Sequence, residues 1–305
     1  MNRLAAQRVY QCLLICGFLI GLSQLSVYAQ TSPLEQALNE TRVVGVDALL
    51  QRFDQEMPVF EVSGGEGAIP VIPRLIVDEL PPQWETNLSI DEKKQVFLHA
   101  LLPLVLVANE FIMADRMRLL DGLAAASQDT ADLPDWIVQL YSDYELEADA
   151  GFAELLRRVN IVPPSLALAQ AALESGWGTS RFADQANALY GEWVWGSGVV
   201  PEEQEEKKGD YGIREFSTLL RSVVSYTNNL NTHPAYEEFR AQRANKVEQA
   251  ELLSGCELAS YLSAYAEMDG EEYAQQLCLI IEQNQLGWFD RAVLENTPAE
   301  LLQLR

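Results

Sequence analysis

Apolar residues recur three or four positions apart over most of the chain, a spacing that predicts helices. The longest such run extends from Ile90 to Leu120. Ser89, with Glu92 three residues later, is typical of a capping box at the start of a helix. Pro103 lies inside the run. Because proline removes a backbone N–H and clashes with the preceding turn, we expect it to kink or divide this helix.

The second half of the chain carries further helical patterns. A helix is predicted to begin at Pro163–Pro164, since proline fits a first turn, and to end at Glu174 just before Gly176. The other predicted helices are a short one starting at Pro134, one capped by Ser217 and reaching about Asn231, one from Tyr236 through Arg243, and a helical hairpin of 257–268 and 271–284.

A different pattern covers Leu189 to Phe216. Gly191, Gly196 and Gly198 surround its tryptophans, which predicts a β-hairpin rather than a packed helix. We therefore expect a small β lobe that faces the end of the helix carrying Glu174. The predicted fold class is mainly α (α+β), a helical lobe with a small β-hairpin lobe, preceded by a helical N-terminal extension.

The first residues have the pattern of a targeting signal. Arg3 and Arg8 precede an apolar run, and Val27-Tyr28-Ala29 offers a signal-peptidase site. An uncleaved anchor is the alternative. Because no later run reaches about 18 consecutive apolar residues, we expect no stable membrane span after cleavage and a location in the periplasm or cell envelope. The predicted segments are 1–29 signal peptide, 30–68 flexible N-terminal segment, 69–150 helical extension, 151–290 main domain and 291–305 C-terminal tail.

The amino-acid composition argues against several classes of function. The 305 residues are 48% hydrophobic and 22% charged, an ordinary globular balance. Acidic residues outnumber basic ones by 45 to 21, and a net charge of −24 repels phosphate backbones, which argues against a nucleic-acid partner. His99 and His233 are the only histidines, which argues against the commonest zinc sites. We expect no metal or organic cofactor, and hydrolytic chemistry would depend on carboxylates.

Two cysteines remain once the predicted signal peptide is removed. Cys256 and Cys278 could form a disulfide in an exported chain. Two buried free thiols are the alternative, since sequence spacing does not show contact.

Glu174 is the first candidate for chemistry. It lies at the C-terminal end of an apolar helix, where both the helix dipole and burial penalise a negative charge and raise the pKa. A carboxyl group that keeps its proton near neutral pH can donate it to a leaving oxygen. A solvated glutamate at a frayed helix end is the alternative.

Aromatic and acidic residues cluster after Glu174. Trp177, Tyr190, Trp193 and Trp195 could stack on sugar rings, or they could form a core cluster. The acidic run 202–206 is either a solvated loop or the source of a second carboxylate.

The segment LALAQAALESGWGTSRFA, Leu166 to Ala183, resembles the catalytic-helix motif of bacterial peptidoglycan glucosaminidases. The resemblance is greatest to the Bax-like subgroup of this endo-β-N-acetylglucosaminidase-like family. It continues through Ala188–Trp193, Tyr211–Phe216 and Asn228–Tyr236, and covers roughly residues 70–290.

This resemblance implies a lysozyme-like fold and hydrolysis of the β-1,4 bond after N-acetylglucosamine in peptidoglycan glycan strands. Glu174 matches the general acid of the family. The second carboxylate would be Glu192, Glu203 or Glu206. Tyr265 resembles the catalytic tyrosine of the family, with Tyr273 as the reserve, and the substrate-binding candidates are Trp177, Tyr190, Trp193, Trp195 and Tyr273. A lytic transglycosylase and a non-catalytic peptidoglycan-binding envelope protein are the alternatives.

Overall fold

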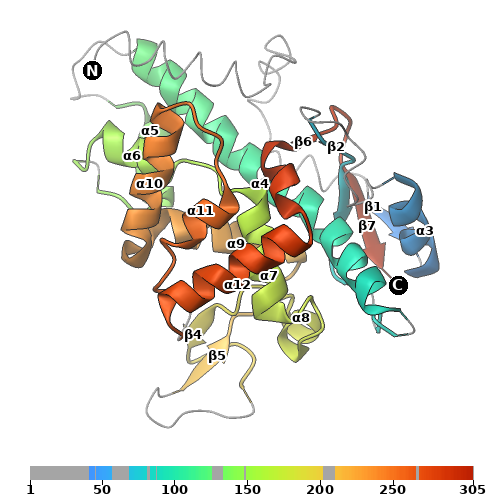
Figure 1. The fold of residues 1–305 in the computed structure, drawn as a ribbon. Coiled ribbons are helices and arrows are strands. Elements are labelled where there is room, and N and C mark those ends of the chain that lie inside the picture. The colour runs from blue at the N-terminus through green and yellow to red at the C-terminus, as the bar shows by residue number, and fades with distance from the viewer. Residues whose placement is uncertain are drawn as a thin grey trace.

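The computed structural model describes residues 41–44, 46–56, 69–80, 83–86, 88–125, 133–147, 149–201, 210–265 and 268–304. The predicted signal peptide, 1–29, lies outside these residues. The described part is mainly helical with short strands (Figure 1), which confirms the predicted fold class.

The centre of the protein is the long helix α4, Ile90–Ala125. Its predicted capping box is confirmed, because the Ser89 backbone N–H donates to Glu92 Oε2 (2.7 Å) and the Glu92 N–H donates to Ser89 Oγ (3.3 Å). Pro103 does not divide the helix. The helix is long and apolar enough to cross a membrane, but 83% of its most apolar stretch is buried inside the protein.

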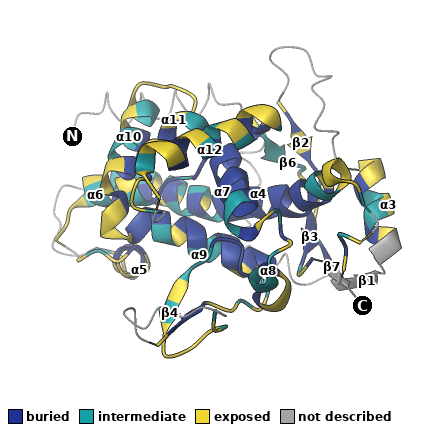
Figure 2. Ribbon diagram, turned by 60° about the horizontal axis from the view of Figure 1, so that its bottom comes forward, coloured by how far each residue is buried: buried dark blue, intermediate teal, exposed yellow. Residues whose placement is uncertain are grey.

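Helix α4 packs against α7, Pro164–Ser175, and α9, Leu219–Thr232. Figure 2 shows α7 as a buried element at the centre of the helical lobe. Every residue from Pro164 to Ala172 is buried, and alanines at four of these positions let the neighbouring helices approach closely. The remaining helices of this lobe are α5 (Asp135–Asp143), α6 (Phe152–Arg158), α8 (Arg181–Ala186), α10 (Glu237–Glu248), α11 (Gly255–Ala259), α12 (Gly270–Gln283), and the short 3-10 helices η3 (Pro234–Tyr236) and η4 (Leu286–Arg291).

Two predicted helix boundaries are wrong. The N-cap of α9 is Thr218, whose hydroxyl accepts from the Arg221 N–H, rather than Ser217. The helix predicted over 257–268 stops at Ala259. Tight turns follow it, closed by hydrogen bonds from Leu262 N–H to the Ala259 carbonyl and from Tyr265 N–H to the Leu262 carbonyl. Each of these bonds spans three residues, so the chain leaves the α-helical path.

The two ends of the described chain meet in a small sheet. Strand β7 (Glu300–Leu304) lies between β1 (Thr41–Val44) and β3 (Leu75–Val77), parallel to both. Strand β2 (Val71–Ile72) pairs with β6 (Val293–Leu294), also in parallel. The segment 291–305, predicted as a tail, therefore contributes strands that pair with the N-terminal extension.

Part of the predicted flexible segment 30–68 is ordered. Residues Val46–Glu56 form helix α3, and its apolar side chains explain why: Leu49 and Phe53 are fully buried in the main core. The burial of two large side chains favours the helix.

The predicted β lobe is confirmed. Strands β4 (Trp193–Trp195) and β5 (Tyr211–Ile213) pair in antiparallel register and project from the helical body (Figure 1).

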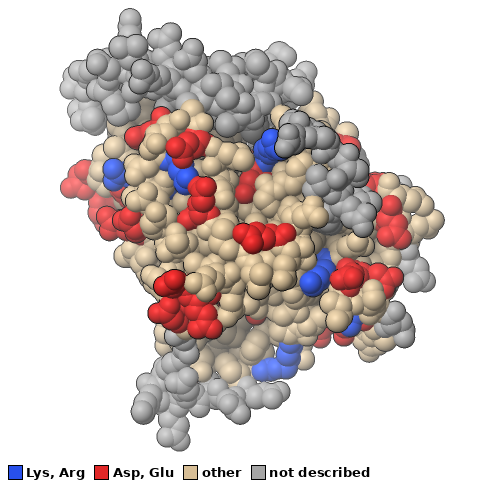
Figure 3. Space-filling view, viewed as in Figure 1, with Lys and Arg blue, Asp and Glu red and all other residues tan. Residues whose placement is uncertain are grey.

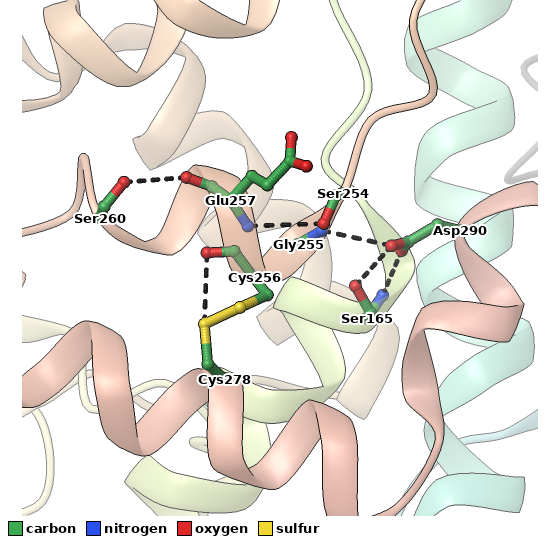
Figure 4. The surroundings of a disulfide bond; sticks show 8 residues. All are labelled: Ser165, Ser254, Gly255, Cys256, Glu257, Ser260, Cys278 and Asp290. Carbon is green, nitrogen blue, oxygen red and sulfur yellow. Dashed lines mark hydrogen bonds between the residues drawn. A yellow bond between two sulfur atoms is a disulfide. The ribbon is translucent and has the colours of Figure 1, made fainter.

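Cys256 and Cys278 form a disulfide that joins α11 to α12 (Figure 4). Nearby, Asp290 accepts hydrogen bonds from the Ser165 N–H (2.9 Å), the Ser165 hydroxyl (2.8 Å) and the Gly255 N–H (3.2 Å). Burial raises the pKa of Asp290 to about 6, and these three donors oppose that rise. One carboxyl group thus satisfies the first turns of both α7 and α11.

Candidate active site

The last turn of α7 places Glu174. The helix ends at Gly176, which has a left-handed backbone (φ 57°) that glycine adopts without steric cost. Ser175 closes the turn: its hydroxyl donates to the Ala171 carbonyl (2.6 Å) and accepts from the Gly178 N–H (2.8 Å). This tight connection fixes the direction of the helix end.

Glu174 is half-buried, so part of its surface stays accessible. Burial raises the pKa of its carboxyl group. A hydrogen bond from the Tyr273 hydroxyl to Oε1 (2.8 Å) acts in the opposite direction because it stabilises the charged form. Burial is the larger effect, and the pKa is raised overall, as the position of this residue in the sequence predicts.

A chain of buried hydrogen bonds leads to this carboxyl group. Tyr226 donates its hydroxyl proton to Gln170 Oε1 (2.7 Å), and Gln170 Nε2 donates to the Tyr273 hydroxyl oxygen (2.9 Å). Tyr273 then donates to Glu174. Gln170 and Tyr226 are completely buried and Tyr273 is 1% exposed, so the chain lies within the core.

Tyr265 does not take the predicted catalytic position. Its hydroxyl donates to the backbone carbonyl of Tyr190 (3.2 Å), and its ring stacks on that of Tyr273 with 5.9 Å between the centroids. Tyr273, on the first turn of α12, is the tyrosine that contacts Glu174. The turns after α11 account for the difference, because they direct Tyr265 towards the chain that enters the β lobe.

Glu192 is the predicted second carboxylate that the structure describes; Glu203 and Glu206 lie outside the described residues. Its Oε2 accepts from the Ser225 hydroxyl (2.8 Å) and from Arg214 (3.3 Å). Its Oε1 is buried and has no hydrogen-bond partner among the described residues. Burial raises the pKa of Glu192, while Ser225 and Arg214 act to lower it.

The predicted sugar-stacking residues fall into two groups. Trp193 and Trp195 are 40% and 69% exposed on the β-hairpin, and the indole of Trp177 is half-buried, with the Lys94 ammonium 5.0 Å from its ring. Tyr190 and Tyr273 are only 3% and 1% exposed. The ring of Tyr190 stacks on Tyr226 at 3.9 Å. Core packing therefore covers the rings of both tyrosines and leaves no open ring face for a sugar to stack on.

Three residues near the carboxylates were missed in the sequence. Gln170 and Tyr226 belong to the buried chain, and Tyr236 has its pKa raised to about 12 by burial, with smaller contributions from the charges of Glu174 and Glu192. Tyr236 is therefore within electrostatic reach of both carboxylates. The sequence does contain one feature that could have identified Gln170. It is a polar residue on an apolar helix, four positions before Glu174 and so on the same face.

The described residues contain no group of three or more His, Cys, Asp or Glu side chains that could hold a metal ion.

Comparison with known proteins shows which family this part of the chain is similar to. A model of the glucosaminidase family, described as mannosyl-glycoprotein endo-beta-N-acetylglucosaminidase, matches residues 150–286. Protein bax of Escherichia coli (strain K12) is 29% identical over 198 residues, which are 63% of this chain and 70% of that protein. The chain is therefore similar to the glucosaminidase family over residues 150–286. The matched region includes Glu174, Glu192 and the whole chain of hydrogen bonds from Tyr226, and the resemblance seen in the catalytic-helix motif is confirmed.

Two further proteins are similar to this chain. Exo-glucosaminidase LytG of Bacillus subtilis (strain 168) is 28% identical over 150 residues, 48% of this chain and 52% of that protein. The crystal structure of the catalytic domain of the autolysin Auto from Listeria monocytogenes aligns with a TM-score of 0.35 and 15% identity, over 67% of this chain and 92% of that one.

Proposed function

We propose that this protein is an exported glycoside hydrolase that cleaves the β-1,4 bond after N-acetylglucosamine within peptidoglycan glycan strands. The observation that carries the proposal is the carboxyl group of Glu174. It is half-buried, has a raised pKa and lies in the region similar to the glucosaminidase family. A raised pKa favours the protonated form of the carboxyl group, which can transfer its proton to a leaving oxygen.

In the proposed reaction, Glu174 protonates the glycosidic oxygen as the bond from that oxygen to the anomeric carbon breaks. The bonding electron pair leaves with the oxygen, and positive charge develops on the sugar ring. Oε1 of Glu174 accepts from Tyr273, so the transferable proton belongs on Oε2.

Glu192 is the residue we assign to the opposite side of the sugar. Ser225 and Arg214 hold its Oε2, and its Oε1 has no partner among the described residues. An ionised Glu192 would stabilise the developing positive charge, or would accept a proton from the water that attacks the anomeric carbon. Where the acetamido oxygen of the substrate performs the first of these roles, Glu192 retains only the second.

The exposed indoles of Trp193 and Trp195 supply the proposed contacts with sugar rings. Both lie on the β-hairpin, and flat aromatic faces bind sugars through a large contact area with little loss of side-chain entropy.

The test is digestion of purified peptidoglycan by the native protein and by Glu174→Gln. The native protein should release reducing ends, and Glu174→Gln should lose at least about 100-fold in rate because it cannot donate a proton. Glu282→Gln, on the exposed surface of α12, removes the same charge and should behave as the native protein does. Equal release by the native protein and Glu174→Gln would refute the assignment.

Mass spectrometry of the products tests the finer points. Reducing N-acetylglucosamine ends support the proposed bond, whereas anhydro-muramyl ends would identify a lytic transglycosylase. Long fragments at early times support endo attack, and small products alone would indicate exo attack. Tight binding to peptidoglycan with no products would indicate a non-catalytic envelope protein.

A further inference from the structure

Gln170 has an unusual position for an amide side chain. It lies inside α7 between fully buried apolar residues and is itself completely buried. A buried amide is costly unless its polar atoms are hydrogen-bonded. The carbonyl oxygen of Gln170 accepts from Tyr226, and its nitrogen donates to Tyr273. Both polar ends of the side chain are thus used.

These two bonds determine the direction of the Tyr273 hydroxyl. An amide nitrogen only donates, so the Tyr273 oxygen accepts from Gln170 and its single proton must be directed elsewhere. Glu174 Oε1, 2.8 Å away, receives that proton. The orientation of the Gln170 amide therefore decides which way the Tyr273–Glu174 bond runs.

The opposite orientation of the amide would reverse the chain. Gln170 Oε1 would then accept from Tyr273, and the Tyr273 oxygen would accept a proton held by Glu174, which would no longer be directed at a substrate. The Tyr226 hydroxyl favours the observed orientation, since the opposite one would remove Gln170 Oε1, the acceptor of its proton. An amide has one acceptor and one donor end, so the hydrogen-bond network selects its orientation.

We propose that Gln170 and Tyr226 are positioning residues that keep the Tyr273 hydroxyl directed at Glu174 Oε1 and so confine the transferable proton of Glu174 to Oε2. This inference rests on the proposed function for its catalytic meaning. The direction of the hydrogen bonds, however, can be tested whether or not the protein is an enzyme.

The decisive variant is Tyr226→Phe, which removes one hydroxyl two hydrogen bonds away from Glu174. Without that donor the Gln170 amide can turn, and Tyr273 then donates to Gln170 instead of Glu174. Because the bond from Tyr273 lowers the pKa of Glu174, its loss raises that pKa further. A merely structural role for Tyr226 would leave the pKa of Glu174 unchanged.

The experiment is a double-mutant cycle read by carbon-13 NMR titration of the glutamate carboxyl groups, with Glu174→Gln used to assign the signal. Tyr226→Phe should raise the pKa of Glu174 in the native background and have no effect in a Tyr273→Phe background, where the bond is already absent. Gln170→Met gives Tyr273 no other acceptor beside Glu174, so it should abolish the effect of Tyr226→Phe on that pKa. Tyr141→Phe, a buried tyrosine on α5, controls for loss of a phenol hydroxyl in the core.

Activity supplies the second measurement. Tyr226→Phe should reduce kcat about 3- to 10-fold, the equivalent of one ordinary hydrogen bond, with KM little changed. An unchanged Glu174 pKa in Tyr226→Phe, or an equal shift in the Tyr273→Phe or Gln170→Met background, would overturn the inference. Coupling seen by NMR in a protein that releases no products would support the positioning role and reject the proposed function.

Discussion

At Glu192, burial and a nearby cation act in opposite directions on one carboxyl group. Burial raises its pKa, and the guanidinium of Arg214, 3.3 Å away, opposes the rise. In the proposed mechanism Glu192 works only when ionised. Activity therefore falls as the pH drops through the pKa of Glu192, and this pKa sets the acidic limb of the pH profile.

Arg214→Ala should move that acidic limb to higher pH, because loss of the cation leaves burial less opposed. Arg214 is 47% exposed, so solvent weakens its effect and added salt should reduce the difference between variant and native protein. The measurement is kcat/KM against pH at low and high ionic strength. Arg221→Ala, an exposed arginine on α9, should leave the limb in place; an equal shift in both variants would contradict the specific role of Arg214.

The sequence predicts Glu174 from its helix end and its motif, because both features are local. It does not predict which tyrosine contacts Glu174. Tyr265 and Tyr273 lie on either side of the same break, and only the tight turns after Ala259 direct one to the Tyr190 carbonyl and the other to the acid. Burial of the ring of Tyr190 likewise depends on Tyr226, which lies on α9, 36 residues further along the chain.

At the scale of elements, Gly178 joins the turn after α7 to the N-terminal extension. A Cβ atom at this position would lie 2.6 Å from Leu80 Cδ1 and 2.8 Å from Phe97 Cδ2, and its φ of +75° also disfavours other residues. Leu80 and Phe97 are both buried and have little room to move. The extension therefore packs directly on the turn that follows Glu174.

Gly178→Ala should lower the free energy of unfolding by the strain of a positive φ plus about 1–3 kcal/mol for overpacking. Gly191→Ala is the matched control: its φ is +65°, but a Cβ atom there would meet nothing within 4 Å, so it incurs the backbone strain alone. Urea unfolding of the two variants gives the comparison. Equal losses would show that the contact with Leu80 and Phe97 adds nothing.

The prediction of helices from the sequence is correct where the helix is long and the spacing of its apolar residues is regular, as in α4 and α7. They fail where distant parts of the chain decide the structure. β3 and β7 are parallel partners more than 200 residues apart, and short strands of this kind leave no periodic signal of their own. Helix α3 is amphipathic, but its burial depends on a core contributed by other segments.

For the whole molecule, the charge predicted from composition is visible on the surface. Figure 3 shows acidic side chains spread over one face, with only scattered basic ones. This distribution agrees with the net charge of −24.

The disulfide should contribute to global stability. The bond from Cys256 to Cys278 joins residues 22 positions apart, and a loop of this length corresponds to roughly 3 kcal/mol in the chain-entropy description. Urea unfolding with and without dithiothreitol should show a lower midpoint on reduction. A variant with both cysteines replaced by alanine should be insensitive to the reductant, and an unchanged native midpoint would show that the bond does not stabilise the fold.

The sheet of β1, β7 and β3 has a consequence for biosynthesis. Its middle strand is residues 300–304, so the two outer strands have no partner until that segment has been synthesised. A nascent chain can fold the helices of residues 150–286 first, but it exposes the apolar strand Leu75–Val77 to aggregation or chaperones until then. Completion of this sheet therefore waits until residues 300–304 have left the ribosome, and this late strand then joins the N-terminal strands β1 and β3.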